Sequence, residues 1–119
     1  MSRLFYSIAA LLWASVIFLL SSFPDLATDL SSTADLILRK GAHIMEFVIL
    51  ALLIHKALGF RNKLWPTLVI GILYAASDEW HQSFVQGRNG NFVDLGIDTL
   101  GVLLGTFLAG RTEKSPWQE

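Results

Sequence analysis

Four long runs of apolar residues alternate with short polar segments along the chain. The first covers residues 4–23 and holds no formally charged side chain, so it is long enough to cross a hydrocarbon core of about 30 Å as a helix. The others cover about residues 41–58, 65–84 and 93–109, and each carries ionisable residues toward one end. The pattern predicts an all-α membrane protein built as a four-transmembrane-helix bundle.

The alternative for the first run is a signal peptide. The apolar region of a signal peptide is about 7–15 residues long and leads to an Ala-x-Ala-like cleavage site. This run is longer and ends in Ser21-Ser22-Phe23-Pro24. We therefore expect a helix that is retained.

The connections between the runs differ in length. Residues 59–64 and 86–91 are short polar segments that predict tight turns. The longer segment, residues 24–40, predicts a short amphipathic helix that lies at the membrane interface and leads into the second span. Its capping residue is Asp29, Ser31 or Ser32, and its apolar face consists of Leu30, Ala34, Ile37 and Leu38. Residues 1–119 then form a single domain.

The composition agrees with a chain covered by lipid. Hydrophobic residues make up 53% and charged residues 16% of the sequence, against about 25% charged residues in ordinary soluble domains. The mean hydropathy is +0.51. A net charge of −1 gives no indication of a nucleic-acid partner, and the absence of cysteine excludes disulfides and thiolate sites.

The basic residues predict the orientation in the membrane. In a four-span arrangement most of the nine basic residues fall on the side that also holds both termini, namely Arg3, Lys56, Arg61, Lys63, Arg111 and Lys114. Only Arg39, Lys40 and Arg88 fall on the other side. The positive-inside rule therefore places both termini in the cytoplasm.

Acidic residues recur at one depth on three of the predicted helices. Counted from the cytoplasmic end of each span at 1.5 Å per residue, Glu46 lies about 18 Å, Asp78 about 20 Å, Asp98 about 17 Å and Asp94 about 23 Å along its helix. A charged side chain at the bilayer centre costs about 2.5–3.5 kcal/mol on insertion scales. We therefore expect these carboxylates, with Glu79, to face each other in a polar pocket toward the outer side.

The spacing within each helix supports this arrangement. Lys40, His43 and Glu46 recur at intervals of three and share one face. On the last span, Asp94 and Asp98 continue along the helix into Gly101-x-x-x-Gly105, which permits close approach of another helix. That approach serves either packing within the bundle or formation of a homo-oligomer.

These motifs resemble those of the VanZ-like family of small bacterial membrane proteins. The pattern runs through Ser21-Ser22-x-Pro24, Lys40-x-x-His43-x-x-Glu46-Phe47, Asp78-Glu79-x-x-Gln82-x-Phe84-x-x-Gly87-Arg88 and Asp94-x-x-x-Asp98-x-x-Gly101-x-x-x-Gly105. The resemblance implies a multi-pass protein of the bacterial cytoplasmic membrane, connected with the cell envelope and with resistance to glycopeptide antibiotics such as teicoplanin. It implies no particular reaction. The resemblance implies that many relatives have an Asn at the position of Asp98. This chain therefore adds one carboxyl group to the predicted group of acids.

The first functional hypothesis is that the pocket binds or modifies a polar head group of a membrane lipid or a lipid-linked envelope precursor. His43 with Glu46 forms a candidate general base, and Asp78 with Glu79 a candidate acid or base. The candidate substrate-binding residues are Lys40, Gln82, Arg88, Asp94 and Asp98, among which Arg88 is suited to clamp an anion. The motifs hold no serine or cysteine nucleophile, so it stays open whether the protein is an enzyme.

Three other hypotheses remain. His43-x-x-Glu46 and Asp78-x-x-His81 are two His/carboxylate pairs that could hold a divalent metal, although no cofactor is required by the pattern. The acidic layer could instead serve as a relay in proton- or ion-coupled transport. Finally, Lys40 and Arg88 could neutralise the acids in a purely structural or partner-binding protein.

Overall fold

Four α-helices make up the part of the chain that the structure describes. The computed structural model describes residues 2–22, 32–58, 64–85 and 92–112, which contain α1 (Arg3–Ser21), α2 (Ser32–Ala57), α3 (Leu64–Gln82) and α4 (Phe92–Thr112) and no strand. Ser2 caps the start of α1, where its hydroxyl accepts a hydrogen bond from the Phe5 backbone N–H at 3.1 Å. The all-helical prediction is confirmed, and three of the four helices lie within a few residues of the predicted runs.

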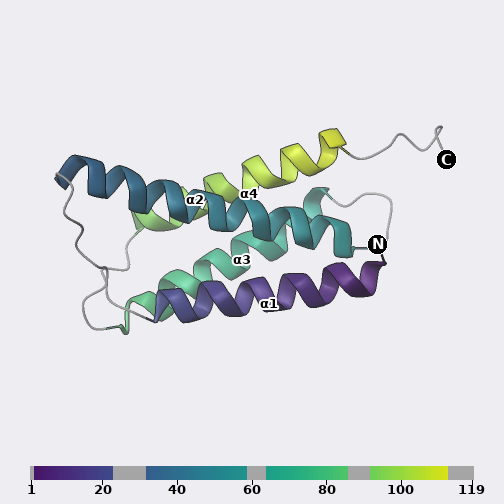
Figure 1. Cartoon of the computed structure of the whole chain (residues 1–119), viewed down its shortest axis with the longest axis horizontal. Coiled ribbons are helices and arrows are strands. Elements are labelled where there is room, and N and C mark those ends of the chain that lie inside the picture. Colours follow the sequence, from purple (N-terminus) through teal and green to yellow (C-terminus); the bar gives the residue numbers. More distant parts are fainter. Residues whose placement is uncertain (1, 23–31, 59–63, 86–91, 113–119) are drawn as a thin grey trace.

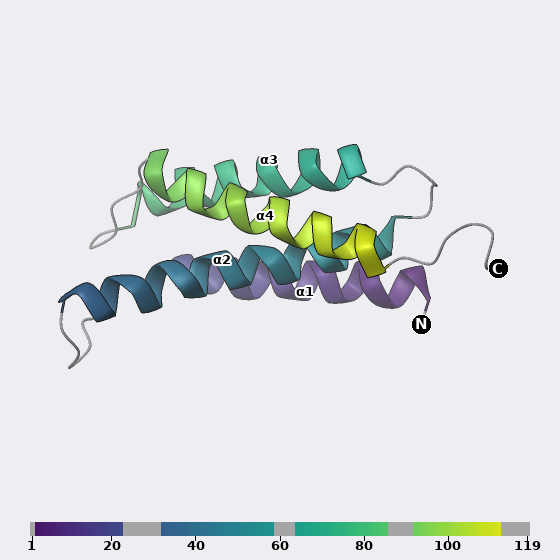
Figure 2. The same cartoon turned by 90° about the horizontal axis from the view of Figure 1, so that it is seen from above.

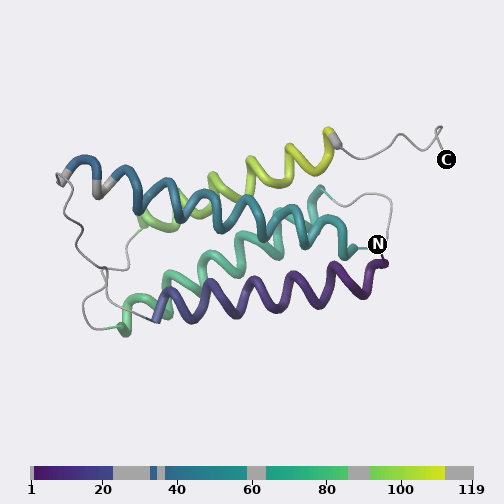
Figure 3. The backbone as a smooth tube through the Cα atoms, viewed as in Figure 1, coloured from purple at the N-terminus to yellow at the C-terminus, as the bar shows by residue number. Residues whose placement is uncertain are grey.

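Successive helices run in opposite directions, as Figures 1 and 2 show. α1 and α3 begin, and α2 and α4 end, at the same end of the bundle, here called the Arg3 end; the opposite end is called the Ser21 end (Figure 1). α2 contacts each of the other three helices, α4 most extensively, whereas α1 and α3 touch each other least. The backbone trace in Figure 3 shows α2 and α4 crossing in the upper half of the view.

The prediction of a separate interfacial helix is wrong for those residues of the segment that the structure describes. Residues from Ser32 onward continue without a break into the second span, so α2 is a single helix of 26 residues, about 39 Å long. The only helix breaker at the junction is Gly41, whose cost of about 1 kcal/mol relative to Ala is too small to end a helix flanked by good helix formers. Residues 24–31 and the two predicted turns at 59–63 and 86–91 lie outside the described residues.

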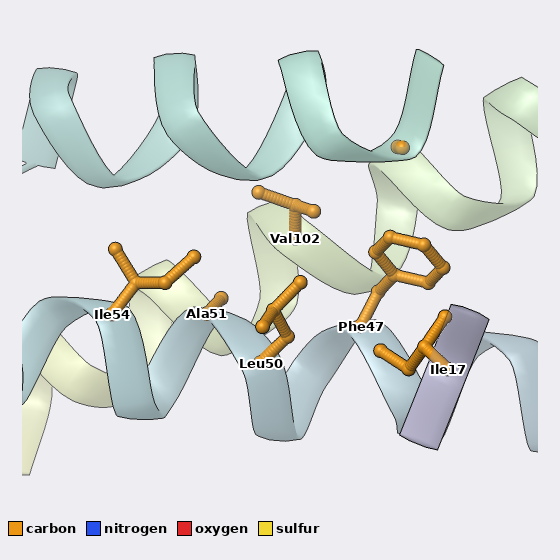
Figure 4. Packing of buried hydrophobic residues seen from close by; sticks show 7 residues of the cluster. Ile17, Phe47, Leu50, Ala51, Ile54 and Val102 are labelled. Carbon is orange, nitrogen blue, oxygen red and sulfur yellow. The ribbon is translucent and has the colours of Figure 1, made fainter. Parts of the chain in front are cut away.

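The apolar core lies between the polar residues of the Ser21 end and the Arg3 end of the bundle. Its fully buried members come from all four helices and are Ile17 of α1, Phe47 and Ala51 of α2, Ala75 of α3 and Val102 of α4. Figure 4 shows Ile17, Phe47, Ala51 and Val102 packed together. Leu50 and Ile54 extend the core along α2 toward the Arg3 end. The burial of these side chains removes apolar surface from solvent on both sides of α2 and joins α1 and α4 to it.

Two glycines let α4 pack directly onto the backbone of α2. A Cβ atom added at Gly101 would lie 2.6 Å from the carbonyl oxygen of Ile44, and one added at Gly105 would lie 2.5 Å from that of Val48. No real side chain fits at such distances, so only glycine permits this approach. The interpretation of the motif as packing within the bundle is thus confirmed, and a homo-oligomer stays a prediction.

The distribution of large apolar side chains and acidic side chains is the reverse of that in a water-soluble protein. Large apolar side chains are exposed on all four helices, among them Leu11, Met45, Trp65 and Phe107. Acidic side chains are instead buried between the helices. By length and composition, α1 and α4 could each cross a membrane, whereas α2 and α3, which carry more of the ionisable residues, do not meet the same criterion.

The glycine contacts generate a test of the packing. Gly105→Ala should lower the free energy of unfolding by about 1–3 kcal/mol, because the new methyl group forces α2 and α4 apart. Gly96→Ala is the matched control on the same helix, since a Cβ there meets nothing within 4 Å, and it should be neutral or stabilise by up to about 1 kcal/mol. Denaturant titration of the purified protein in detergent measures both, and equal destabilisation by the two variants would contradict the proposed contact.

Candidate functional site

Asp98 lies at the centre of the polar residues. Its side chain is 1% exposed, and its Oδ1 lies 3.5 Å from Nδ1 of His43 on α2. The same Nδ1 lies 3.9 Å from Oε2 of Glu46, one turn further along α2. His43 is therefore placed between two carboxylates from different helices. Both distances are long for a hydrogen bond, as is common for catalytic groups before a ligand is bound.

Lys40 and Asp94 form a second contact between α2 and α4. The ammonium group of Lys40 pairs with Oδ1 of Asp94, nearer the Ser21 end than His43 and Asp98. α2 and α4 run in the same direction, so the pair Lys40–Asp94 is followed in register by His43–Asp98 and then by the glycine contacts. Lys40 neutralises one acid of the site, and the pair is only partly buried, with exposed fractions of 33% and 18%.

A second group of polar side chains lies between α3 and α1. Asp78 is 3%, Glu79 8% and Gln82 2% exposed. The amide Nε2 of Gln82 donates to Oδ2 of Asp78 at 2.9 Å and to Oγ of Ser21 at 3.1 Å. Gln82 thereby joins the acid of α3 to the end of α1. The Gln82 amide nitrogen thus bonds to groups of the protein itself, and a contact of Gln82 with a substrate stays a prediction.

The two groups lie close enough to interact electrostatically. Asp98 of α4 is within range of the charges of His43 on α2, Asp78 on α3 and Asp94 on its own helix. Tyr74 of α3 is likewise within range of Asp78 and of Glu46. Acids from three helices therefore meet inside the bundle, as the depth of each along its helix predicts. We call these residues the polar layer: Lys40, His43, Glu46, Asp78, Glu79, Gln82, Asp94 and Asp98. Arg88, predicted to join them, lies outside the described residues.

His81 faces α1, away from His43. Its Nε2 lies 3.0 Å from Oγ of Ser22, and its ring stacks on that of Phe18 with centroids 4.2 Å apart. The proposed metal alternative paired His81 and Asp78 with His43 and Glu46. Across residues 2–22, 32–58, 64–85 and 92–112, no group of three or more His, Asp or Glu side chains is arranged to hold a metal ion.

A cavity of about 270 Å³ opens between α1 and α3 and reaches the polar layer at Asp78. Its other lining residues are Phe18, Tyr74, Ser77, Trp80, His81 and Phe84. The sequence led us to expect a pocket between Glu46, Asp78 and Arg88. Among these, Asp78 lines the cavity and Glu46 does not, because the cavity lies on the α1 side of α3 whereas Glu46 belongs to the α2 side of the layer.

Several residues of the site were not expected to belong to it. Ser21 and Ser22 are polar residues at the end of the first apolar run, a signal that suggests a contact but does not identify its partner. Tyr74 donates a hydrogen bond through its hydroxyl to the carbonyl oxygen of Ala14. Trp13 donates from Nε1 to the carbonyl oxygen of Glu46 at 2.9 Å, which fixes α1 against the helix turn that carries His43.

The chain belongs to the VanZ/LLP1 family, whose family model matches residues 4–111. The match covers all four helices almost completely, so the helices that carry the polar layer are part of the family's common region. The resemblance drawn from the spaced polar motifs is confirmed. No curated protein and no solved structure matches the chain.

The hydrogen bond to Ser21 can be tested by removing one hydroxyl group. Ser21→Ala should lower the free energy of unfolding by about 0.5–1.5 kcal/mol, because the buried amide of Gln82 loses one of its two acceptors. Ser15→Ala is the matched control, since Ser15 is an exposed serine of the same helix that bonds only to Leu11 O. It should change the free energy of unfolding by less than about 0.5 kcal/mol. If the two variants have the same stability, the link between α1 and α3 contributes nothing.

Proposed function

We propose that this VanZ/LLP1 protein spans the bacterial cytoplasmic membrane four times and that its polar layer binds the polar head group of a membrane lipid or lipid-linked envelope precursor. The single observation that carries the proposal is the reversed distribution of side chains. Acidic groups converge between the helices, while the outer surfaces of the helices are apolar. A protein arranged in this way is suited to hydrocarbon outside and to a polar ligand within.

The outer surface supports the membrane location. Leu11 and Trp65 are each 70% exposed, whereas Asp98 is 1% exposed. In water, large exposed apolar areas and buried acids both carry a free-energy cost. In a bilayer the exposed side chains contact lipid instead. α1 is the clearest case, because its only buried residues are Ile17 and Ser21.

The lengths of the helices fit four spans. The shortest helices, α1 and α3, have 19 residues each, about 28 Å, against a hydrocarbon core of about 30 Å. α2 and α3 fall short in hydropathy because of the polar residues that they direct into the bundle. Such residues are tolerated in membrane helices when they face the interior and each other.

The basic residues of the described helices support an orientation with the Arg3 end in the cytoplasm. Arg3, Lys56 and Arg111 lie at this end, and the Lys56 ammonium group lies 5.6 Å from the ring centre of Tyr6 on α1. Arg39 and Lys40 lie toward the opposite end. The majority at the Arg3 end agrees with the positive-inside rule and supports an orientation in which the polar layer lies in the outer part of the membrane.

The chemistry of the layer suits a head group that exchanges hydrogen bonds and protons. His43, held between Glu46 and Asp98, carries an imidazole that can accept or donate a proton. Asp78 and Glu79 supply a second pair of groups for acid–base chemistry on α3. If the protein turns over its ligand, a water molecule activated by His43 is the nucleophile that these residues favour.

The packing does not favour transport. On the Arg3 side of the layer the bundle is filled by Phe47, Ala51 and Val102, all fully buried. No described acid continues the layer through this apolar core toward the cytoplasmic end. The second of the two experiments below distinguishes a purely structural role of the polar layer from ligand binding.

The orientation can be read from single cysteines, because the chain has none of its own. Ser83→Cys, at an exposed position beyond α3, should react with a membrane-impermeant maleimide in right-side-out membrane vesicles. Ser2→Cys, exposed at the other end, should react only after the vesicles are permeabilised. The reverse labelling would invert the topology, and labelling of both positions in sealed vesicles would exclude this four-span orientation.

Ligand binding by the polar layer predicts stabilisation by lipid. Phospholipid added to the purified protein in detergent should raise the free energy of unfolding by about 3 kcal/mol when its concentration reaches 100 times the dissociation constant. The probe is an equal mixture of phosphatidylethanolamine and phosphatidylglycerol. His43→Gln and Asp98→Asn should abolish most of this gain, because they remove the groups that meet the head group.

The control for this experiment is Thr106→Val. Thr106 is a buried polar residue of α4, 3% exposed, whose hydroxyl bonds only to Val102 O within its own helix. The variant should keep the full lipid-dependent gain. A gain that is the same in the wild-type protein and in the His43 and Asp98 variants would favour the structural role of the layer.

A further inference from the structure

We infer that the hollow between α1 and α3 holds one hydrocarbon chain of the bound lipid, so that the ligand reaches the polar layer sideways, from the membrane, through this seam. The inference rests on the proposed function and specifies the route and the class of the ligand. The observation that carries it is an apolar groove that reaches Asp78, a buried acid of the polar layer.

The groove follows the weakest contact between helices. α1 and α3 touch least among the contacting pairs of helices. Beside the cavity at Asp78 lies a second hollow of about 410 Å³, lined by Leu11, Ala14, Ser15, Phe18, Leu19 and Tyr74. Phe18 and Tyr74 line both hollows, so the two adjoin at these side chains. Their volumes fall near or within the range of about 300–1,000 Å³ that is usual for small-molecule sites.

The register of the two helices fixes the length of the groove. α1 and α3 run in the same direction, and Tyr74 lies level with Ala14, as His81 does with Ser22. On this register the groove extends from the level of Leu11 to that of Phe84, about 20 Å along the bundle. That length exceeds what a head group alone needs and suits an extended aliphatic chain.

The groove is lined mainly by apolar side chains along its whole length, and its acid and its histidine, Asp78 and His81, lie toward the Ser21 end. Toward the Arg3 end the lining consists of Leu11 and the small residues Ala14 and Ser15. Toward the Ser21 end it carries Ser77, Asp78 and His81. A lipid of the outer leaflet has its tail toward the membrane centre and its head group outward, so tail and head group meet matching surfaces.

Near the Ser21 end the groove offers hydrogen-bond acceptors among its apolar side chains. Asp78 contributes a carboxyl group, and the Ser77 hydroxyl donates its proton to Tyr74 O at 2.7 Å, which leaves its oxygen to accept. A head group that carries donors, such as an ammonium group or sugar or glycerol hydroxyls, is complementary to this end. A bare phosphate monoester is not, because it would meet the Asp78 carboxyl group.

Retention of lipid by groove variants tests the inference. The protein is placed in nanodiscs of phosphatidylethanolamine, phosphatidylglycerol and phosphatidic acid in equal parts, transferred to mild detergent, and examined by native mass spectrometry. One phospholipid per chain should be retained, with either of the first two favoured about tenfold over phosphatidic acid. Ser15→Phe and Ser77→Phe, which fill the groove, should each lower retention about tenfold.

The neighbouring positions supply matched controls. Val16→Phe and Ala76→Phe add the same ring at exposed positions of the same turns that do not line either hollow, and they should retain lipid like the wild-type protein. Because all four sites are in the bundle's outer shell, thermal unfolding of each variant confirms that it is folded before retention is compared.

The outcomes separate this inference from the function on which it rests. If the wild-type protein neither retains lipid nor is stabilised by it, the proposed function fails. If the lipid-dependent stabilisation depends on His43 and Asp98 but retention is unchanged by Ser15→Phe and Ser77→Phe, the function stands and the groove is not the route. A preference for phosphatidic acid, or a lipid-free dimer whose formation the two groove variants block, would also overturn the inference.

Discussion

The contact of α4 with the backbone of α2 sets the geometry of the rest of the protein. Gly101 and Gly105 bring the two helices together more closely than any side chain would allow. Because the helices run in the same direction, this contact also fixes their register, so that His43 meets Asp98 and Lys40 meets Asp94. The acids of α4 are held against basic groups of α2 only while the helices keep this spacing. The glycines therefore position the polar layer, although they take no part in its chemistry.

The cost of burying charge explains the arrangement of the remaining helices. A carboxyl group that pointed outward from α3 or α4 would meet the apolar surroundings of an otherwise apolar surface. Turning Asp78 and Asp98 inward places them near each other, and hydrogen-bonding and charged partners then offset the burial, as Gln82 does for Asp78. α1 closes this side of the bundle through Ile17 in the apolar core and through hydrogen bonds to backbone or side-chain oxygens. The same groups that make the layer suitable for a ligand thus also hold the helices in place.

Much of the fold and of the polar layer could be predicted from the sequence, because two features of the pattern carry the information. The lengths of the apolar runs indicated the helices, and the depth of each acid along its helix indicated the layer. Asp98 of α4 does approach His43, and Asp78 of α3 lies within electrostatic range of Asp98. The continuity of α2 was not predicted, because the amphipathic pattern before Gly41 suggested the end of a separate helix. Nothing in the backbone requires a helix to end there. The partners of Ser21 and Tyr74 could not be predicted, because they depend on the register of α1 against α3. The lateral cavity depends on how side chains of different size fill that seam, which no spacing along one helix reveals.

The sparse burial of α1 has a consequence for how the protein opens. Only Ile17 and Ser21 of this helix are buried, and single hydrogen bonds from Trp13, Tyr74 and Gln82 provide its polar attachments to α2 and α3. The α2–α4 pair, by contrast, interlocks through backbone as well as side chains. Local stability is therefore uneven. The free energy of opening should be smallest for α1, so its amide protons should exchange fastest. Movement of this one helix would widen the seam while the paired helices and the acids that they carry stay where they are.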